Sequence, residues 1–454
     1  SRGREAFQEV DQVATFGGLC KAAMELDDSA DLFPATARLV ELSRRGRPGP
    51  VLLALPEDVL GSTVELVRPI AAAEAGSEDG PFEPAEPPPG AVEAVLLALA
   101  EARRPVVLAG AGVLRAGATP ALAALAGALS VPVIASWRRP DVLPNDDPHY
   151  LGMSGLGAPG TVRERLLGAD VIVALGCRLN AITTFDDAVP APGTRIIHVD
   201  AEPGWPGRPL PWLAIRADAG RFLGEALRRA RAGIGRPVDP AGRAASNAHD
   251  RAAYEAALAL PPSHGRDGAG VAPAAVVSAL QAALPRDAII TTDAGNFAAW
   301  YARYLRLMAG QRFLGPTSGA MGYGLPAAIG AAIAEPDRTV VALAGDGGLA
   351  MLMAELETAV REGLRLTVLV HDNERYGTIR MHQEQAHPGR VTATELGPID
   401  FAAVARACGA HGLTVERDAD VAAALAAALA SDGVTLIHLQ LDRAVLSLGQ
   451  RLDP

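Results

Sequence analysis

The sequence is poor in cysteine and lysine. Only three cysteines occur among its 454 residues, Cys20, Cys177 and Cys408, and they form no CxxC pair. This spacing argues against a disulfide framework and against a zinc ribbon, so three buried thiols are the simpler interpretation. Lys21 is the only lysine among 41 basic residues. We attribute that bias to genomic base composition and not to function.

Long apolar runs and clusters of basic residues are also missing. No apolar stretch reaches the roughly 18 residues of a membrane-spanning helix. With a net charge of −11 and no arginine-rich run, the chain does not resemble a nucleic-acid-binding or membrane-surface protein. No secretory leader is recognisable in the printed sequence. We therefore expect a cytoplasmic protein that has neither nucleic acid nor membrane as a partner.

The sequence does contain a repeated alternation of apolar strands with helices. Its length is too great for one ordinary core, so two or three domains are expected. Strands that alternate with helices predict an α/β fold with parallel sheets covered on both faces. We expect three doubly wound parallel-sheet domains, the N-terminal one truncated. The expected organisation is 1–62 for the end of a first domain, 63–90 for a linker, 91–235 for a central domain, 236–270 for a second linker and 271–454 for a third domain.

Ligands of an open parallel sheet bind just beyond the carboxyl ends of its strands. In the third domain, glycine-rich and polar residues follow three expected strands, at 293–297, 345–348 and 372–377. We therefore expect the functional site at this edge of the sheet. The expected helices of the chain include 36–44 and 121–129, and its expected strands include 51–55, 106–109, 131–136, 171–175, 196–200, 288–292, 340–344, 366–370 and 435–440.

The strongest local signal is the segment VVALAGDGGLAM, in which strand 340–344 runs into the loop 345–348 and a helix starts near Ala350. Glycines let the backbone approach a phosphate, and a helix N-terminus presents free N–H groups to it. Asp346 lies in that loop, and a carboxylate is compatible with a diphosphate when a cation such as Mg²⁺ joins them. A lone GDG is more often a plain turn.

The second half of the signal follows 27 residues after Asp346, where strand 366–370 leads to Asp372 and Asn373. Carboxyl ends of neighbouring parallel strands meet at one sheet edge. An amide oxygen of Asn373 and an exposed backbone carbonyl can therefore complete a Mg²⁺ coordination shell with Asp346. A GDG loop, a helix, a strand and then DN at this spacing is much more specific than the loop alone.

These segments resemble the cofactor motif of thiamine-diphosphate enzymes, which reads GDG, some two dozen residues and then NN. The chain looks most like large-subunit acetolactate synthases, along nearly all of its length and most strongly over 315–380. The resemblance implies thiamine diphosphate and Mg²⁺ as cofactors. Asp372 replaces the first asparagine of the family motif, which is not the usual ligand. The implied metal ligands are Asp346, Asn373 and the main-chain oxygen of Arg375, and the implied cofactor contacts of these loops also include Gly345, Gly347, Gly348 and Tyr376.

Two further segments carry the resemblance. In TSGAMGYGLPAAIG, residues 317–330, the family's pattern places the carbonyl of Gly319 and the N–H of Met321 on the aminopyrimidine ring. The Met321 side chain would wedge between the two cofactor rings and impose a bend that brings the amino nitrogen beside the reactive carbon. In isolation, Met321 would more often be core filler. In TTDAGNFAAW, residues 291–300, the expected diphosphate contacts are Gly295, Asn296 and Phe297.

The N-terminal segments GREAFQEVDQVA and GRPGPVLLALPEDVL resemble the end of the family's pyrimidine-binding domain. The resemblance places Phe7, as a substrate contact, and Gln8, as a catalytic residue, at the active site of a neighbouring subunit. A homodimer is then the minimum unit, and a homotetramer is also expected. The family's glutamate that hydrogen-bonds the aminopyrimidine would lie upstream of Phe7, outside the printed chain. By itself, the printed chain is therefore expected to be inactive.

The central segment has a loosely dinucleotide-like Gly110-Ala111-Gly112, but a lone GxG is a weak signal. Acetolactate synthases keep a non-reacting FAD on this domain. Here GMSGLGAPG at 152–160 departs from the family's GMxGMHG, so FAD stays a minor alternative to a central domain without it. A plain NAD- or FAD-binding oxidoreductase is a further alternative for the chain as a whole.

The expected reaction is decarboxylation of a 2-oxo acid, carboligation of its product to an aldehyde or other carbonyl, or both. The family's arginine that grips the carboxylate of a second keto acid becomes Ile182, which removes a bidentate contact. The family's tryptophan becomes His382, an expected acid–base or substrate group that is equally interpretable as a surface histidine. Ile379 is a third expected substrate contact. We expect an acceptor without a carboxylate; the alternative is a non-catalytic relative that keeps the fold.

Overall fold

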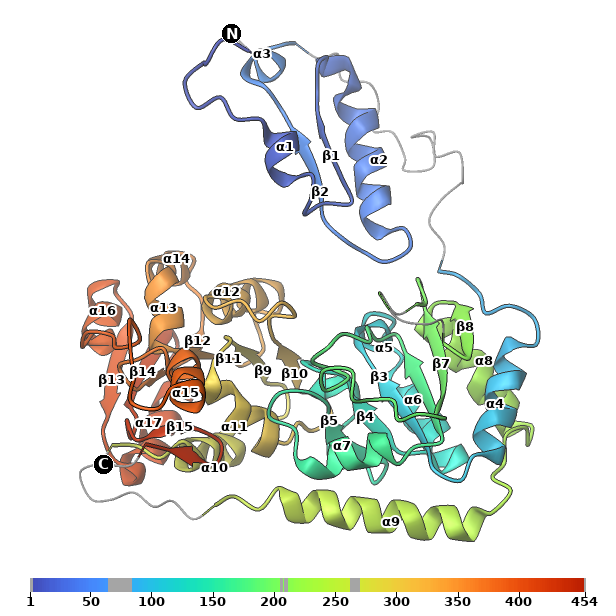
Figure 1. Cartoon of the computed structure of the whole chain (residues 1–454). Coiled ribbons are helices and arrows are strands. Elements are labelled where there is room, and N and C mark those ends of the chain that lie inside the picture. The colour runs from blue at the N-terminus through green and yellow to red at the C-terminus, as the bar shows by residue number, and fades with distance from the viewer. Residues whose placement is uncertain (1–2, 64–83, 205–206, 208–210, 262–269, 453–454) are drawn as a thin grey trace.

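The computed structural model describes residues 3–63, 84–204, 207, 211–261 and 270–452, which form three α/β units in chain order (Figure 1). The linker expected over 63–90 lies largely outside the described residues. None of the helices in these ranges combines the length and the hydrophobicity that a membrane span requires.

The N-terminal unit is a two-stranded parallel sheet with short helices around it. Its small core contains Leu26, Ala35 and Val59. Arg47 links this unit to the central domain, because its main-chain N–H donates to Glu202 Oε1 at 2.9 Å and its guanidinium lies 3.6 Å from Asp200. The elements are α1 (Gln12–Phe16), β1 (Ala22–Glu25), η1 (Ser29–Asp31), α2 (Leu32–Arg44), β2 (Val51–Ala54) and α3 (Glu57–Leu60).

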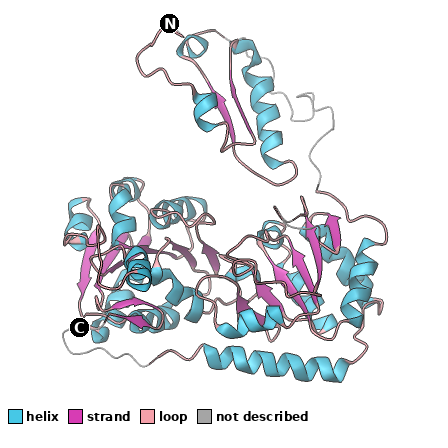
Figure 2. Ribbon diagram, in the orientation of Figure 1, coloured by secondary structure: helices cyan, strands magenta, loops and turns pink. Residues whose placement is uncertain are grey.

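The central domain is built on a six-stranded parallel sheet in the order β5-β4-β3-β6-β7-β8, with helices packed around it (Figure 2). Strands β3 and β6 are buried along their whole length, as expected for parallel strands covered on both faces. Its elements are α4 (Ala91–Glu101), β3 (Pro105–Ala109), α5 (Ala111–Arg115), α6 (Thr119–Leu129), β4 (Val133–Ala135), η2 (Pro140–Val142), β5 (Tyr150–Met153), α7 (Gly160–Leu167), β6 (Val171–Leu175), β7 (Arg195–Asp200), β8 (Leu213–Arg216) and α8 (Ala219–Arg231).

The C-terminal domain has a second six-stranded parallel sheet, in the order β10-β9-β11-β12-β14-β13, and a small hairpin of β15 and β16. Strand β10 is added on one side of β9, and β11 is added on its other side. The direction in which the chain adds strands therefore reverses between β9 and β11. Its elements are α10 (Pro273–Ala283), β9 (Ile289–Thr292), α11 (Asn296–Tyr304), β10 (Arg312–Leu314), α12 (Gly324–Ala334), β11 (Val340–Gly345), α13 (Asp346–Leu352), α14 (Glu355–Arg361), β12 (Leu366–Asp372), α15 (Gly377–Ala386), α16 (Phe401–Ala407), β13 (His411–Val415), α17 (Asp418–Leu429), β14 (Val434–Gln440), β15 (Val445–Ser447) and β16 (Gln450–Arg451).

The segment 236–270, expected to be a linker, contains the 18-residue helix α9 (Pro240–Ala257). The expectation is corrected because a composition rich in alanine and arginine suits a helix as well as a linker. Asp239 caps the helix by accepting from Gly242 N at 2.9 Å. The buried Arg243 donates to the carbonyls of Leu99 at 2.7 Å and Leu129 at 3.2 Å. These carbonyls lie at the ends of α4 and α6, where helices leave acceptors unpaired.

The C-terminal end of α9 lies where the central and C-terminal domains meet, and the helix runs beneath the central domain in Figure 1. Arg251 donates to the carbonyl of Tyr150 at 2.6 Å, and Glu255 pairs with Arg306 at 3.1 Å. Beside them, Asn145 and Leu307 exchange hydrogen bonds of 2.8 and 2.9 Å. The two larger domains are therefore joined by polar contacts near this helix end.

Candidate active site

A cavity of about 600 Å³ lies at the carboxyl ends of β9, β11 and β12, where residues of the central domain close one side. Every site residue expected from the central and C-terminal domains, from Ile182 to His382, lines this cavity. This is the position that the change of direction between β9 and β11 favours for a ligand. Phe7 and Gln8 do not line it, and Phe7 is 92% exposed. Their assignment to a neighbouring subunit's site stays a prediction.

Three helices begin at this cavity, each directly after one of these strands. Helices α11, α13 and α15 have Gly295, Gly345 and Tyr376 as N-cap residues; the two glycines have no side chain to accept a capping hydrogen bond, and the side chain of Tyr376 accepts none. The first N–H groups of a helix have no partner within the helix, and they favour a negatively charged ligand. Three uncapped helix N-termini around one cavity therefore suit a ligand with several negative charges, such as a diphosphate.

The glycines of the GDG loop are explained by close packing. A Cβ on Gly347 would lie 2.5 Å from the ring of Tyr376, and one on Gly348 would lie 2.4 Å from Asp293 Oδ2. Any larger residue would displace these neighbours or the loop. The helix begins at Asp346, four residues earlier than the expected start near Ala350. Asp346 is thus the first residue of α13.

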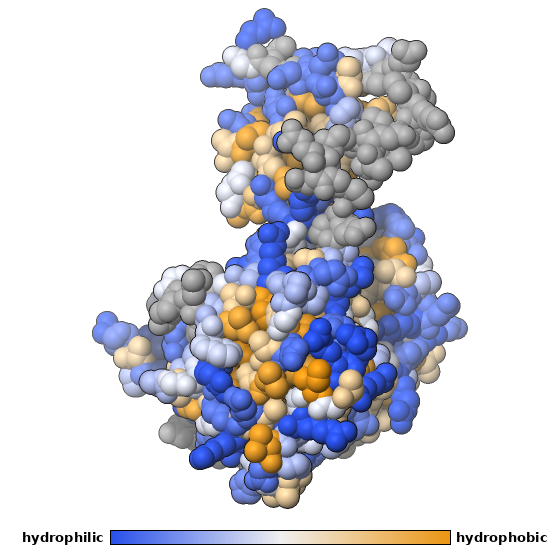
Figure 3. Space-filling model, turned by 90° about the vertical axis from the view of Figure 1, so that its right-hand side faces the viewer, coloured by the Kyte–Doolittle hydropathy of each residue, from blue (hydrophilic) through white to orange (hydrophobic). Residues whose placement is uncertain are grey.

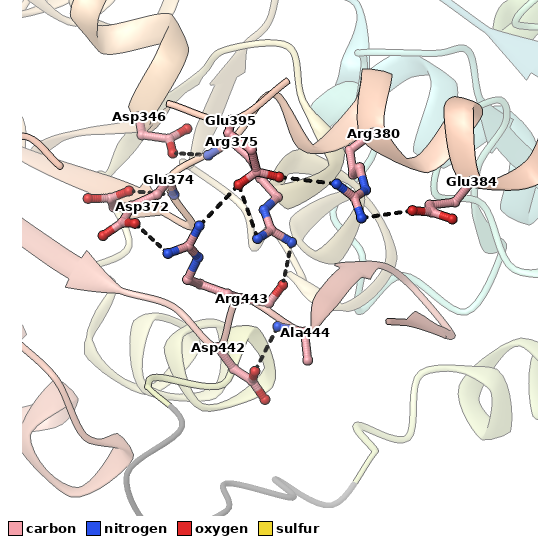
Figure 4. Close-up of polar contacts among 10 residues, drawn as sticks. All are labelled: Asp346, Asp372, Glu374, Arg375, Arg380, Glu384, Glu395, Asp442, Arg443 and Ala444. Atoms are coloured by element: carbon pink, nitrogen blue, oxygen red, sulfur yellow. Dashed lines mark hydrogen bonds and ion pairs between the residues drawn. The ribbon is translucent and has the colours of Figure 1, made fainter. Parts of the chain in front are cut away.

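Asp346 holds the two loops together. Its Oδ1 accepts from Gly347 N at 2.7 Å and its Oδ2 accepts from Arg375 N at 3.1 Å (Figure 4). Among the described residues, the side chain of Asn373 has no recorded hydrogen bond, so its amide oxygen is available. A carboxylate, an amide oxygen and a main-chain carbonyl are the hard oxygen donors that Mg²⁺ prefers. The residues present therefore fit a magnesium ion shared with a diphosphate.

Asp372 lies beside Asp346, because residue 345 of β11 pairs with residue 371 of β12. Burial and the nearby charge of Asp372 raise the pKa of Asp346 to about 7. Burial also acts on Asp372, but His438 Nε2 at 2.7 Å and the N–H of Glu374 lower its pKa overall. The departure from the family's asparagine thus comes with a buried histidine that bonds the new carboxylate. A cation between the two loops would offset the charges of both aspartates.

The side chain of Arg375 points away from Asp346. It donates to the carbonyl of Arg443 at 3.1 Å and pairs with Glu395 at 3.4 Å, within a network of arginines and glutamates (Figure 4). Glu395 also pairs with Arg380 and Arg443. This network holds the loop after β12, so the contribution of Arg375 to the site comes from its main chain.

Met321 reaches into the cavity from the segment between β10 and α12 and is 39% exposed. Gly319, two residues earlier, has a φ of 73°, a left-handed conformation that favours glycine. Trp137 of the central domain lies close, with Cη2 3.9 Å from the position that a Cβ on Gly319 would take. The expected ring-binding segment therefore lies where the two domains meet.

His371 and the two aromatic residues around it form the floor of the cavity. Phe297 stacks on the imidazole of His371, with ring centroids 4.7 Å apart. Tyr301 Oη lies 2.6 Å from His371 Nε2, and His371 Nδ1 lies 2.9 Å from the carbonyl of Ala344. Burial lowers the pKa of His371 to about 4, so the ring is neutral at physiological pH. The sequence motifs did not identify His371 or Tyr301, because neither belongs to a loop motif.

The side chain of Asn296, an expected cofactor contact, forms hydrogen bonds within the protein. Its Nδ2 donates to the carbonyl of Leu446 at 2.8 Å, and its Oδ1 accepts from Thr378 Oγ1 at 3.0 Å. The side chain therefore ties the start of α11 to the start of α15 and to the C-terminal hairpin. Only its main-chain N–H, at the uncapped end of α11, remains for an anion.

The expected substrate residues lie around the remaining wall. Ile182 comes from the central domain, whereas Ile379 and His382 come from α15, where both are exposed at the cavity edge. Sequence reasoning missed Trp137, Arg138, Met153 and the hairpin residue Leu446, which also line the cavity. These residues belong to no recognisable motif, because only the docking of the two domains brings them to the site.

The dinucleotide-like glycines of the central domain have a packing role. A Cβ on Gly110 would lie 2.5 Å from Cys177 Cβ, and one on Gly112 would lie 2.6 Å from Gly176 Cα. The N–H of Gly112 donates to the carbonyl of Gly176 at 2.8 Å. These glycines let two backbone segments touch, which is a sufficient reason for the GxG pattern. A second cavity, of about 1310 Å³, lies at the same sheet edge.

Comparisons with known proteins agree with this geometry. Residues 92–226 match the family model described as "Thiamine pyrophosphate enzyme, central domain", and residues 293–439 match "Thiamine pyrophosphate enzyme, C-terminal TPP binding domain". Thiamine pyrophosphate is another name for thiamine diphosphate. The chain belongs to the thiamine pyrophosphate enzymes and is a thiamine-diphosphate-dependent enzyme with an acetolactate synthase-like sequence.

Two classes of relatives are similar over most of this chain. The "Acetolactate synthase isozyme 2 large subunit" of Escherichia coli (strain K12) is 30% identical over 97% of this chain and 77% of its own length. The "Acetolactate synthase large subunit" of Parasynechococcus marenigrum (strain WH8102) is 31% identical over 97% and 70%. The "Sulfoacetaldehyde acetyltransferase" of Rhodobacter capsulatus is 32% identical over 94% and 74%. The expected fold class and family are confirmed.

Proposed function

We propose that the protein uses thiamine diphosphate and Mg²⁺ to decarboxylate a 2-oxo acid, to ligate the product to a carbonyl acceptor, or both. The observation that carries this proposal is the meeting of three uncapped helix N-termini with the oxygen donors of Asp346, Asn373 and Arg375. Anion-binding N–H groups and hard metal ligands are both required for a magnesium diphosphate.

Asp346, the amide oxygen of Asn373 and the carbonyl of Arg375 would hold the metal, and the N–H groups of α11, α13 and α15 would hold the diphosphate. When bound, the cofactor supplies an electron sink for decarboxylation. Met321 would fix the orientation of the rings, and Phe297 and His371 would exclude water from the floor of the cavity. His382 at the cavity edge is the expected acid–base or substrate-binding group.

The substrate pair is proposed to differ from that of acetohydroxyacid synthases. Ile182 lies where the family has its carboxylate-binding arginine, and with Ile379 it presents an apolar side chain to the cavity. The similar relatives act, by their names, as acetolactate synthases and as sulfoacetaldehyde acetyltransferases. Relatives with the same cofactor chemistry therefore differ in their acceptor, and we propose that this protein differs from acetolactate synthases in the same way.

A homodimer or homotetramer in the cytoplasm is proposed as the working form. The N-terminal unit exposes large apolar side chains, including Phe7 at 92% and Leu19 at 74%, and apolar surface is visible on this unit in Figure 3. Exposed apolar side chains of this size favour a protein contact. Such a contact would bring Phe7 and Gln8 to the site of a neighbouring subunit.

The test is calorimetric titration of the full-length protein with thiamine diphosphate, with and without Mg²⁺, followed by assay of CO₂ release from a panel of 2-oxo acids. We expect metal-dependent cofactor binding and CO₂ release from at least one acid. Absence of cofactor binding in the presence of Mg²⁺ would refute the proposal. Binding without turnover of any acid, alone or with aldehyde acceptors, would favour a non-catalytic relative.

A further inference from the structure

Arg138 is a buried cation in the wall of the cavity. It follows β4 in the loop that the central domain extends towards the C-terminal domain, and its side chain lines the cavity although it is only 6% exposed. Its φ is 64°, an uncommon conformation for a long side chain. Strained residues that the surrounding structure holds in place are frequent at ligand sites.

The protein makes few favourable contacts with this buried guanidinium. Nη2 donates to the carbonyl of Asp293 at 3.3 Å, and Nε is buried without a hydrogen-bond partner. Among the described residues, no carboxylate lies within ion-pair distance of Arg138. The carboxylate of Asp293 is its main source of favourable charge, but Oδ1 of that group accepts from Gly324 N at 2.9 Å. A buried charge of this kind is costly unless it is paired.

The charge nevertheless persists at physiological pH. The pKa of Arg138 is lowered to about 10, chiefly by burial, with Asp293 raising it and the neighbouring Arg139 lowering it to a smaller extent. The cation also lies 5.1 Å from the ring centre of Trp137, a contact that helps to hold it. The cavity therefore contains a fixed positive charge that no protein group neutralises directly.

Arg138 lines the same cavity as Ile182, which by the sequence resemblance takes the position of the family's arginine. Ile182 Cγ2 and Trp137 Cδ1 each lie 2.9 Å from the position that a Cβ on Gly155 would take. Arg138 follows Trp137 directly, and its Cδ lies 2.8 Å from the corresponding position on Gly315. A cation is thus supplied to the same cavity from a different segment of the chain.

We propose that Arg138 is the specificity-determining residue of this cavity and binds an anionic group of the substrate, a carboxylate or a sulfonate. This inference rests on the proposed function and changes one expectation drawn from Ile182, because the acceptor then carries an acidic group after all. Both oxyanions match the planar fork of a guanidinium. Recognition is expected to lower KM for acidic substrates without changing how the cofactor binds.

The first experiment is a titration with probes that cannot react. Propionate, ethanesulfonate and the uncharged propionamide are titrated by calorimetry into the full-length protein, with and without thiamine diphosphate and Mg²⁺. Arg138→Met removes the charge and keeps the apolar stem, and Arg138→Lys keeps the charge but loses the fork. Arg312→Met is the matched control, because Arg312 is exposed on the neighbouring β10 and does not line the cavity.

We expect at least one of the two anions to bind the wild-type protein and propionamide to bind much more weakly. Arg138→Met should weaken anion binding roughly 10- to 100-fold, which is typical for the loss of a charge-assisted hydrogen bond. Arg138→Lys should restore part of it, and Arg312→Met should bind as the wild type does. The stronger of the two anions identifies the acidic group. Equal anion binding by the wild type and Arg138→Met, or no anion binding by the wild type, would overturn the inference.

The second experiment separates this inference from the proposed function. Arg138→Met should keep the wild-type affinity for thiamine diphosphate, and its KM should rise for acidic acceptors but not for uncharged aldehydes. A purely structural Arg138 would instead lower kcat and cofactor affinity for all substrates alike. If the wild type binds no thiamine diphosphate, the proposed function fails, whereas the titrations with unreactive anions still test Arg138.

Discussion

The two six-stranded parallel sheets differ in strand order, but each has a point where the chain changes direction along the sheet, and these two points differ. In the central domain this point lies between β3 and β6, where the N–H of Gly112 donates to Gly176. In the C-terminal domain it lies between β9 and β11, beside the starts of three helices that have no N-cap side-chain hydrogen bond. In the central sheet this point is a close glycine contact that borders the second cavity, whereas in the C-terminal sheet it borders the candidate active site. Loop packing at the point of reversal therefore differs between the two sheets.

The largest expected effect comes from replacing Asp346, which follows β11. It is compared with the effect of replacing Asp200, the last residue of β7. Asp346→Ala should weaken Mg²⁺-dependent binding of thiamine diphosphate by more than about 100-fold, because it removes a proposed metal ligand. Asp200→Ala is the matched control at the end of β7 in the central sheet, and it should change binding less than about twofold. Calorimetric titration measures both. Unchanged cofactor affinity in Asp346→Ala would exclude the proposed metal site.

A second effect concerns the stability of the central domain alone. Arg243→Met leaves the carbonyls at the ends of α4 and α6 without their buried donor, so the free energy of unfolding of this domain should fall by about 3 kcal/mol. Denaturant unfolding followed by tryptophan fluorescence measures it. Arg221→Met, which breaks an exposed ion pair with Glu86, should have little effect. If both variants behave alike, α9 does not hold the domain together.

A third effect tests the ring-binding segment. Met321→Ala should reduce the rate of CO₂ release by roughly 10-fold, because the cofactor rings lose the support that fixes their orientation. Affinity for the cofactor should change much less, since the diphosphate contacts remain. Met351→Ala, on the exposed side of α13 in the same domain, is the control. A loss of affinity equal to the loss of rate would show that Met321 only binds the cofactor.

The smallest effect concerns the unusual acidic residue at the end of β12. Asp372→Asn restores the family's amide and can still accept hydrogen bonds from His438 and from Glu374 N. We expect the affinity for Mg²⁺ and thiamine diphosphate to change less than about threefold, as measured by calorimetry. A much larger loss would mean that the carboxylate of Asp372 itself takes part in metal binding.

The fold could be predicted where burial is uniform. Strands β3, β6, β11 and β12 are continuous apolar runs, and their expected positions agree with the structure to within one or two residues. Strand β13 was missed because its sequence, HGLTV, is that of a partly exposed edge strand. Helix α9 was taken for a linker, because its anchoring depends on Arg243 and its distant carbonyl partners.

The site could be predicted only where its chemistry is local in sequence. The GDG loop and Asn373 follow neighbouring strands of one sheet, so motif and topology together were sufficient to predict that they lie at one cavity. Arg138 and Trp137 reach the cavity from another domain, and Leu446 reaches it from a C-terminal hairpin. Which residues meet at a domain boundary depends on how the domains dock, and no periodicity in the sequence reports that.

The contacts at the end of α9 have a consequence for how substrates enter and leave. Opening the cavity by a hinge between the domains would have to break the Glu255–Arg306 ion pair and both hydrogen bonds between Asn145 and Leu307. Arg303 adds two more bonds, to the carbonyls of Gly157 and Ala158. Substrate entry and product release are therefore expected to depend on the local mobility of α15, which carries Ile379 and His382. The two sheets are expected to keep a constant separation throughout turnover.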